Sequence, residues 1–209
     1  MIQNILFDFD GVILDSMPMR EYGFKKIFEK YSSELVEKLL EYHNKNGGLS
    51  RYVKIRYFYE KLLNENISDN EVNTIADDFS EIMRKKLIDK KYLISETINF
   101  IKNNYKNYNL HIVSGSDEKE LRFLCKELNI DNYFISINGS PTHKNDLVKN
   151  VLSKYGYIKN QTILIGDSIN DYIASKANEI NFYGYNNIEL KTISYFYVQN
   201  YNYIKDTLK

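Results

Sequence analysis

Two aspartates, Asp8 and Asp10, directly follow the short apolar run Ile5–Phe7 in the segment QNILFDFDGVILDS. An apolar run of this length that ends in polar residues and Gly11 predicts a buried strand leading into a tight turn. Two like charges this close repel each other unless a cation, a proton or a substrate offsets the repulsion. Gly11 also lets backbone N–H groups approach an anion beside the carboxylates. The pattern indicates a divalent metal with an anionic ligand, and an ordinary acidic turn is the alternative.

Polar residues also follow two later apolar runs of the chain. Leu110–Val113 is followed by the segment SGS, and Thr162–Ile165 is followed by GDSIND. From Lys91 onward, strand-like and helix-like patterns alternate, which predicts βαβ units and a parallel sheet. Ligands bind at the carboxyl ends of the strands in such sheets, so side chains that follow different strands should meet at one edge. The residues expected there, including a lysine that begins a predicted helix in the same layer, are Asp8, Asp10, Ser114, Gly115, Lys144, Asp167 and Asp171.

The aspartates of this group favour magnesium. Asp8, Asp10 and Asp167 offer hard oxygen ligands, and Mg²⁺ binds through a few carboxylates together with substrate phosphate. Zinc is disfavoured, because its sites need several His or Cys ligands and the histidines of the chain show no ligand spacing. We therefore expect Mg²⁺ as the cofactor.

The same residue types suit phosphoryl transfer. Asp8, at the tip of its strand, could attack phosphorus and form an aspartyl phosphate. Asp10 could protonate the leaving alkoxide and later deprotonate the attacking water. The transferred group needs in-line positioning and neutralisation of its equatorial oxygens. The Ser114 hydroxyl, the Gly115 amide and Lys144 would neutralise those oxygens together with Mg²⁺.

Length and composition limit the classes of protein. The 209 residues, 43% of them hydrophobic, can bury one good-sized core with a smaller appended domain. Lys+Arg 28 balance Asp+Glu 28 and no long basic run occurs, so we expect no nucleic-acid partner and no membrane partner. No basic segment followed by an apolar stretch begins the chain, which favours a cytoplasmic location, and the oligomeric state stays open. Cys125 lies among apolar helix positions and is expected to be a buried structural thiol.

Residues 16–88 show no strand-like alternation and predict an all-helical segment. Apolar residues recur there at three and four positions, as in VKIRYFYEKLL. The segment NGGLSR interrupts the helices, and Ser50 can serve as the N-cap of the helix that follows. The start of that helix, with Arg51 beside it, would suit an anion, and the alternative is a plain capped turn with a solvent-facing arginine. The expected helices are Met19–Tyr31, Ser33–His43, Arg51–Asn64 and Asn70–Leu87.

Four segments together resemble the motifs of the haloacid dehalogenase superfamily of phosphohydrolases. The segment DFDGVILDS from Asp8 resembles the first motif, D-x-D-G-x-x-x-D, and GDSIND, which ends at Asp171, resembles the fourth, G-D-x-x-x-D. Val113-Ser114-Gly115 is similar to the second motif, and Lys144 to the third, with Lys149 as an alternative lysine. The motifs occur in the family's order over nearly the whole chain. His143, next to the lysine, is expected to be structural.

The resemblance implies an α/β fold with a Rossmann-like parallel sheet core and an all-helical cap domain inserted after the first strand. The core would comprise residues 1–15 and 89–209, and the cap residues 16–88. The resemblance also implies roles for single residues. These are a nucleophile and metal ligand (Asp8), an acid/base whose backbone carbonyl binds the metal (Asp10), a metal ligand (Asp167), support for the lysine or for metal-bound water (Asp171), and phosphate binding (Ser114, Gly115, Lys144).

The function implied is a Mg²⁺-dependent phosphatase that hydrolyses a small phosphorylated metabolite. Asp10 favours phosphate-ester chemistry, because members of the superfamily that cleave carbon–halogen or phosphonate bonds lack an acid there. The segment GLSR, which ends at Arg51, resembles the cap segment with which β-phosphoglucomutases grip the second phosphate of their substrate. Arg51 is therefore a candidate substrate contact, a phosphosugar is the favoured substrate, and a sugar-phosphate mutase is the alternative function. A third interpretation is a non-catalytic module that accepts a phosphoryl group on Asp8.

Overall fold

The protein is built on a six-stranded parallel sheet, seen in a computed structural model that describes residues 1–208. The strand order is β3-β2-β1-β4-β5-β6, so the direction of winding reverses between β1 and β4. Doubly wound sheets bind ligands at such a reversal, outside the carboxyl ends of the strands. The strands are β1 (Asn4–Phe7), β2 (Asn109–Asp117), β3 (Ser136–Ser140), β4 (Thr162–Gly166), β5 (Asn181–Tyr185) and β6 (Phe196–Val198).

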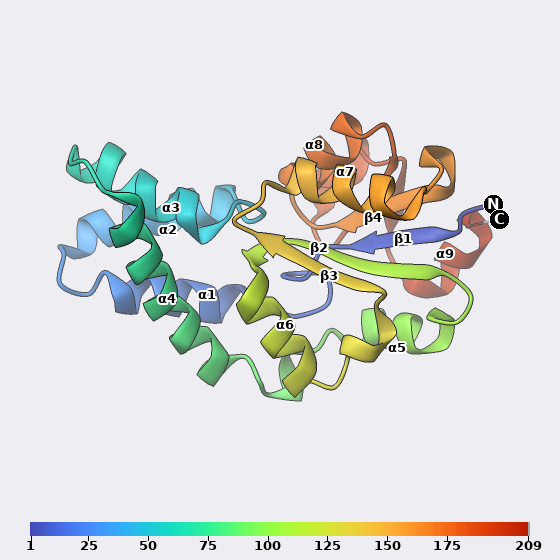
Figure 1. Ribbon diagram of the computed structural model, residues 1–209, viewed down its shortest axis with the longest axis horizontal. Coiled ribbons are helices and arrows are strands. Elements are labelled where there is room, and N and C mark those ends of the chain that lie inside the picture. The colour runs from blue at the N-terminus through green and yellow to red at the C-terminus, as the bar shows by residue number, and fades with distance from the viewer. Residues whose placement is uncertain (209) are drawn as a thin grey trace.

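The central strand β1 is covered on both faces. Ile5 and Phe7 point to one face and pack in a cluster with residues of α5, α6 and α9, while Leu6 points to the other and packs with residues of α7 and α8. All three side chains are fully buried, which explains the continuous apolar run in a parallel strand. Figure 1 shows helices on both sides of the sheet. Their bounds are α5 (Ser95–Asn104), α6 (Glu118–Glu127), α7 (Lys144–Tyr155), α8 (Ile169–Ala177) and α9 (Tyr201–Thr207).

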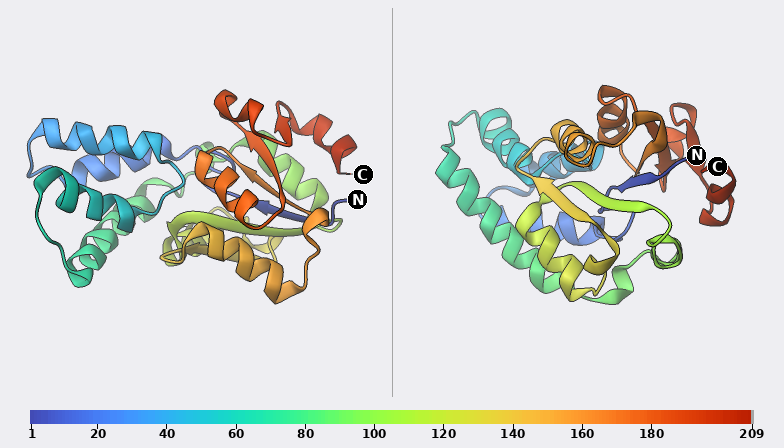
Figure 2. Two further views of the ribbon diagram at one scale, coloured as in Figure 1. Left: turned by 90° about the horizontal axis from the view of Figure 1, so that it is seen from above. Right: turned by 45° about the vertical axis from the view of Figure 1, so that its right-hand side comes forward.

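A group of helices between β1 and α5 stands at the end of the sheet toward which the strands point (Figures 1 and 2). We refer to this group as the cap. It packs around aromatic side chains, with the rings of Phe28 and Phe58 stacked 4.1 Å apart. Ser68 and Glu71 form a capping box at the start of its longest helix. The cap contains α1 (Met17–Ile27), α2 (Ser33–Lys45), α3 (Arg51–Tyr57), the π-helical η1 (Phe58–Leu63) and α4 (Asp69–Lys86).

The predicted parallel sheet and the helical segment after the first strand are both confirmed. Three details differ. The mostly apolar run Tyr133–Ile137 also predicts a strand, but β3 begins only at Ser136, because the residues before it form a 3₁₀ turn. Strand β2 extends to Asp117, so Ser114 lies within the strand and not after it. The short edge strand β6 was not predicted, since a three-residue strand shows too little alternation to detect. The division into a core and a cap domain stays a prediction.

Short 3₁₀ segments complete the chain, and no helix within residues 1–208 combines the length and hydropathy needed to cross a bilayer. The 3₁₀ segments are η2 (Lys90–Tyr92), η3 (Asp131–Tyr133), η4 (Lys159–Gln161) and η5 (Ile188–Thr192).

Replacing Leu6 by alanine should lower the free energy of unfolding by about 2–5 kcal/mol, because the truncation leaves a cavity under a fully buried strand. Urea denaturation followed by circular dichroism measures this loss. Ile158→Ala is the matched control, since that side chain is 57% exposed and its truncation should change stability by less than about 0.5 kcal/mol. A loss at Leu6 no larger than the control's would contradict the packing of β1.

Candidate active site

Asp8 is the first residue beyond β1, and the fold holds its carboxylate in a defined orientation. Its Oδ1 accepts a hydrogen bond from the backbone N–H of Phe9 at 2.7 Å and lies 3.0 Å from Lys144 Nζ. Among the described residues, Oδ2 has no hydrogen-bond partner. The carboxylate is 96% buried. Oδ1 is thus held by a backbone N–H and a lysine ammonium, and Oδ2 remains available for bonding.

Three carboxylates and one lysine meet where β1 and β4 end. Single oxygens of Asp8, Asp167 and Asp171 lie within 4.8 Å of one another, and Lys144 Nζ lies 2.5 Å from Asp171 Oδ1. Burial and then the charge of Asp171 raise the pKa of Asp8 to about 7. Burial and then Asp8 raise the pKa of Asp167. Burial by itself would lower the pKa of Lys144, but Asp171 and Asp8 raise it above its ordinary value.

The charges of this cluster fit a divalent cation. When all three carboxylates are ionised, the ammonium of Lys144 leaves two negative charges uncompensated in a buried place. Asp171 is already engaged, because its Oδ2 accepts hydrogen bonds from the N–H and hydroxyl of Ser168 at 3.0 and 2.6 Å. Asp8 and Asp167 are therefore the carboxylates with most freedom to bind a metal, and Asp171 holds Lys144. Hard oxygen donors of this kind suit Mg²⁺.

Gly11 allows the turn after β1 to lie directly against Asp167. Its φ is +74°, and a Cβ at this position would collide with the carboxylate of Asp167. Two asparagine side chains from the loop after β5 hold the same backbone. Asn186 donates to the Gly11 carbonyl and Asn187 to the Asp167 carbonyl, both at 3.0 Å. The loop after β5 thus fixes the distance between the first and fourth motifs.

The phosphate-binding residues expected on β2 lie beside Asp8 in the same cavity. Ser114 is buried, and its hydroxyl accepts a hydrogen bond from the Ser116 N–H at 3.2 Å. The cap presses on this strand end, because a Cβ on Gly115 would collide with the carbonyl oxygen of Gly48. Glycine at both positions therefore permits the close contact between cap and core.

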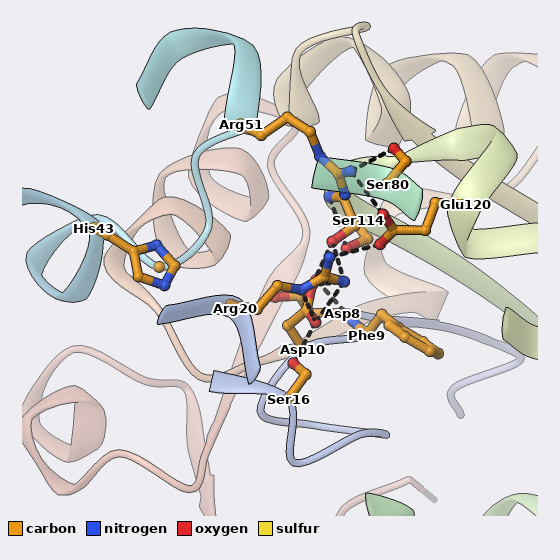
Figure 3. Close-up of polar contacts among 12 residues, drawn as sticks. Asp8, Phe9, Asp10, Ser16, Arg20, His43, Arg51, Ser80, Ser114 and Glu120 are labelled. Carbon is orange, nitrogen blue, oxygen red and sulfur yellow. Dashed lines mark hydrogen bonds and ion pairs between the residues drawn. The ribbon is translucent and has the colours of Figure 1, made fainter. Parts of the chain in front are cut away.

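The Asp10 carboxylate points toward the cap and not into the acidic cluster (Figure 3). It accepts hydrogen bonds from the hydroxyl of Ser16, the hydroxyl of Ser116 at 2.5 Å and Nε of Arg20 at 3.0 Å. Burial by itself would raise the pKa of Asp10, but Arg20 and Ser116 hold it below its ordinary value. In this arrangement Asp10 is ionised and can accept a proton.

A chain of buried ion pairs continues from Asp10 into the cap (Figure 3). Arg20 Nη1 donates to Glu120 Oε1 at 2.5 Å, and Arg51 Nη1 donates to Glu120 Oε2 at 2.6 Å and to the Ser80 hydroxyl at 2.6 Å. Glu120 is fully buried, and although burial would raise its pKa, Arg51 and Arg20 lower it. Arg51 is only 4% exposed, so the alternative of a solvent-facing arginine is wrong. That Arg51 contacts the substrate stays a prediction.

Lys54 and His43 are a second pair of buried cap residues in the cavity that contains Asp8. Lys54 Nζ lies 2.8 Å from His43 Nδ1 and 3.3 Å from the Gly47 carbonyl oxygen. Burial lowers the pKa of Lys54 to about 7, with Asp10 opposing the shift. Burial and then Lys54 lower the pKa of His43 to about 3, so His43 is neutral at pH 7.

The site has a small cavity on one side of Asp8 and a larger cleft on the other. Between cap and core, a cavity of about 30 Å³ is lined by cap residues and by the ends of β1 and β2. On the other side of Asp8, a cleft of about 790 Å³ lies between α2 and the loops that follow β4 and β5. Both regions include Asp8 and Asp10. The two aspartates of the first motif thus border both the small cavity and the cleft.

Three further expectations concern residues near the motifs. Lys144 is buried in the site, whereas the alternative Lys149 is exposed. The His143 side chain accepts from the Asn145 N–H at 3.4 Å and caps α7, which confirms a structural role. Cys125 is fully buried, and burial raises the pKa of its thiol to about 12.

The sequence predicted the residues of the four motifs and Arg51 of the cap, but not the other charged or polar residues that the cap and α6 contribute. Arg20, His43, Lys54 and Glu120 belong to no motif, and each is separated in sequence from its partners. Their charged or polar types at buried helix positions are a signal that a helical projection could have revealed. Their partners depend on the packing of the cap against the core.

A doubly wound sheet with carboxylates, a serine and a lysine at its switch point is typical of α/β enzymes that bind phosphorylated ligands. Residues 5–185 match the model of the haloacid dehalogenase-like hydrolases, and the chain belongs to this family. The family predicted from the four motifs is therefore confirmed.

The chain is also similar to individual proteins of known activity. It is 25% identical to a phosphoglycolate phosphatase of Vibrio vulnificus over 90% of this chain and 87% of that protein. It is 20% identical to a phosphorylated carbohydrates phosphatase of Thermotoga maritima over 84% of this chain and 81% of that protein. A β-phosphoglucomutase structure from Clostridium difficile shares the fold, with a TM-score of 0.80, 16% identity and coverage of 100% and 97%. The protein is thus an enzyme of the phosphatase type.

Lys54→Met should remove a pH dependence of stability. A lysine pKa lowered from 10.5 to about 7 in the folded state means that the unfolded state binds more protons between these values. Stability of the wild type should therefore rise relative to Lys54→Met from pH 7 to pH 10, by at most about 1.4 kcal/mol per pH unit. Chemical denaturation of both proteins across this range measures the difference. Parallel stability curves would show that burial does not lower the pKa of Lys54.

Proposed function

We propose that the protein is a Mg²⁺-dependent phosphatase that hydrolyses a small phosphorylated metabolite through an aspartyl phosphate on Asp8. The observation that carries this proposal is the orientation of Asp8, whose Oδ1 is held by Lys144 and the Phe9 N–H. Its other oxygen would attack phosphorus, the ester P–O bond would break, and the leaving alkoxide would take a proton. Attack of water on the acyl phosphate would then release phosphate and restore the carboxylate.

Asp8, Asp167 and the backbone carbonyl of Asp10 are the groups that we propose to hold the metal. Bound there, Mg²⁺ would neutralise the phosphoryl oxygens and the carboxylate cluster. Lys144 binds the opposite side of Asp8 and is itself held by Asp171, so its ammonium is oriented before the substrate arrives. The Ser114 hydroxyl and the Gly115 amide complete the proposed phosphate site.

Asp10 is proposed as the acid and base of the two steps. Arg20 stabilises the ionised form of Asp10, and this form would take a proton from the attacking water. Donation to the leaving group in the first step requires a protonated Asp10, and therefore a weaker contact with Arg20, which lies on the cap helix α1. The position of the cap thus affects the protonation of Asp10.

A phosphosugar or a similarly small phosphate ester is the proposed substrate. The relatives named for phosphorylated carbohydrates and for phosphoglycolate support this size and chemistry. Arg51 is retained as a proposed substrate contact because it lines the cavity. A cytoplasmic location is proposed with it, on the composition and on the absence of a membrane-spanning helix within residues 1–208.

A sugar-phosphate mutase is the second candidate. The small volume of the cavity beside Asp8 supports it, since a site with little room for water would preserve an aspartyl phosphate for transfer to a second hydroxyl. The fold shared with a β-phosphoglucomutase is compatible with either activity. A non-catalytic module is not favoured, because the chain belongs to a hydrolase family.

Phosphate release from a panel of phosphorylated metabolites should require both Mg²⁺ and Asp8. Asp8→Asn removes the nucleophilic charge with little change in shape, so turnover should be lost while the circular dichroism spectrum and melting temperature remain near the wild type's. Isomerisation of glucose 1-phosphates is followed in parallel. Release that survives chelation would refute the metal role, and isomerisation with little release would favour the mutase.

Asp10→Ala should slow turnover by roughly 10²–10⁴-fold, because it removes the proton donor and acceptor. The phosphoenzyme on Asp8 should last longer than in the wild type, and rapid-quench mass spectrometry measures its lifetime. Asp15→Ala, at an exposed aspartate of the same motif, is the control and should turn over near the wild-type rate. Equal rates for the two variants would remove Asp10 from the mechanism.

A further inference from the structure

A buried lysine without a carboxylate partner lies in the cap. Lys54 is 2% exposed, and its Nζ contacts only His43 Nδ1 and the Gly47 carbonyl oxygen among the side chains and backbone that the structure describes. An unpaired buried cation is unfavourable, and an ammonium has three hydrogens to donate. An anion entering this cavity would therefore pair with Lys54.

His43 offers a second unpaired donor beside it. When Lys54 is protonated its ammonium can only donate, so Nδ1 of the neutral His43 ring accepts and the ring hydrogen lies on Nε2. This Nε2 is buried and has no partner among residues 1–208. A buried donor without an acceptor is unfavourable by itself, so the pair together favours a ligand that accepts two hydrogen bonds.

The two arginines of the cavity differ from Lys54, because both have carboxylate partners. Arg20 pairs with Asp10 and Glu120, and Arg51 pairs with the other oxygen of Glu120. The positive charges of the arginines and the negative charges of these two carboxylates cancel. Lys54 is therefore the basic side chain in the cap part of this cavity that pairs with no described carboxylate.

The number of free donors distinguishes between kinds of anion. The Lys54 ammonium, which already contacts His43 Nδ1 and the Gly47 carbonyl oxygen, has one further hydrogen to donate, and His43 Nε2 has another. A carboxylate is planar and accepts at two oxygens, which matches one ammonium and one imidazole N–H. A second phosphoryl group presents three acceptor oxygens and would need more donors than this pair supplies.

We propose that Lys54 and His43 form a subsite for a carboxylate on the leaving group, so that the preferred substrates are phosphorylated hydroxy acids, sugar acids among them. This inference rests on the proposed phosphatase function and deepens it. The phosphoryl group would lie at Asp8, and the carboxylate would lie in the cap cavity that Asp8 also lines.

Matched substrates test the subsite in the wild type. 3-Phosphoglycerate and glycerol 3-phosphate differ by a carboxylate in place of a hydroxymethyl group, as do 6-phosphogluconate and sorbitol 6-phosphate. In at least one pair, kcat/KM with Mg²⁺ should be roughly 10- to 100-fold higher for the acid, the range expected for hydrogen bonds to charged groups. No preference in either pair, or a stronger preference for glucose 1,6-bisphosphate, would overturn the proposal.

The variant Lys54→Met tests whether Lys54 itself binds the substrate carboxylate. It should lower kcat/KM for the acids roughly 10- to 100-fold more than for their neutral partners, mainly through KM. Lys38→Met removes an exposed lysine of the same cap and should leave the preference for acids intact. Equal losses for both members of a pair would reduce Lys54 to a structural role. Lys54→Gln, which keeps a donor without the charge, replaces Lys54→Met if that variant does not fold.

Turnover of p-nitrophenyl phosphate distinguishes a failure of the carboxylate subsite from a failure of the phosphatase function. Turnover without a preference for acids would contradict the subsite alone, whereas no turnover of any ester would contradict the phosphatase function. In that second case, calorimetry of 3-phosphoglycerate and glycerol 3-phosphate binding to the wild type and to Lys54→Met still decides the subsite. Tighter binding of the acid that Lys54→Met loses supports it, and equal binding overturns it.

Discussion

The structure depends on how the negative charges of three buried carboxylates are neutralised at the point where the winding of the sheet reverses. Asp8, Asp167 and Asp171 converge because β1 and β4 are adjacent and end together, and Lys144 lies between two of them. Repulsion among these carboxylates strengthens with burial, since a low dielectric magnifies every charge interaction. The buried strands β1 and β4, Gly11 and the asparagines of the loop after β5 keep the carboxylates together despite that repulsion.

A second set of charges connects this cluster to the cap. Asp10, Arg20, Glu120 and Arg51 alternate in sign and form consecutive contacts between the sheet, α1, α6 and α3. Such pairs tolerate burial only when each charge is matched, so opening the cap would expose or separate them. The ionised state of Asp10 therefore depends on the closeness of cap and core. Lys54 lies outside this chain, and its separate position makes it a point of recognition for a substrate group.

Much of the catalytic end of the sheet was predictable. The apolar run before Asp8 and the one before Gly166 identified central strands, and their polar ends predicted the edge at which the carboxylates meet. The helical period of residues 16–88 identified the cap helices. Strand β6 was not predictable, because a three-residue edge strand has almost no pattern. Glu120 was equally hidden, since a glutamate within an amphipathic helix normally faces solvent, and here it is fully buried between two arginines from other helices.

The sequence by itself determined the types of residue at the strand ends, the family, and the alternation of strands and helices, because these follow from local composition and spacing. The tertiary structure decided which charges neutralise which. Asp10 binds Arg20, Arg51 is neutralised by Glu120, and Lys54 is left to His43. These pairings follow from how the cap helices pack against α6 and β2, and packing between segments far apart in the chain has no local signature. The sequence shows that a charged residue is present, but three-dimensional proximity decides which group neutralises it.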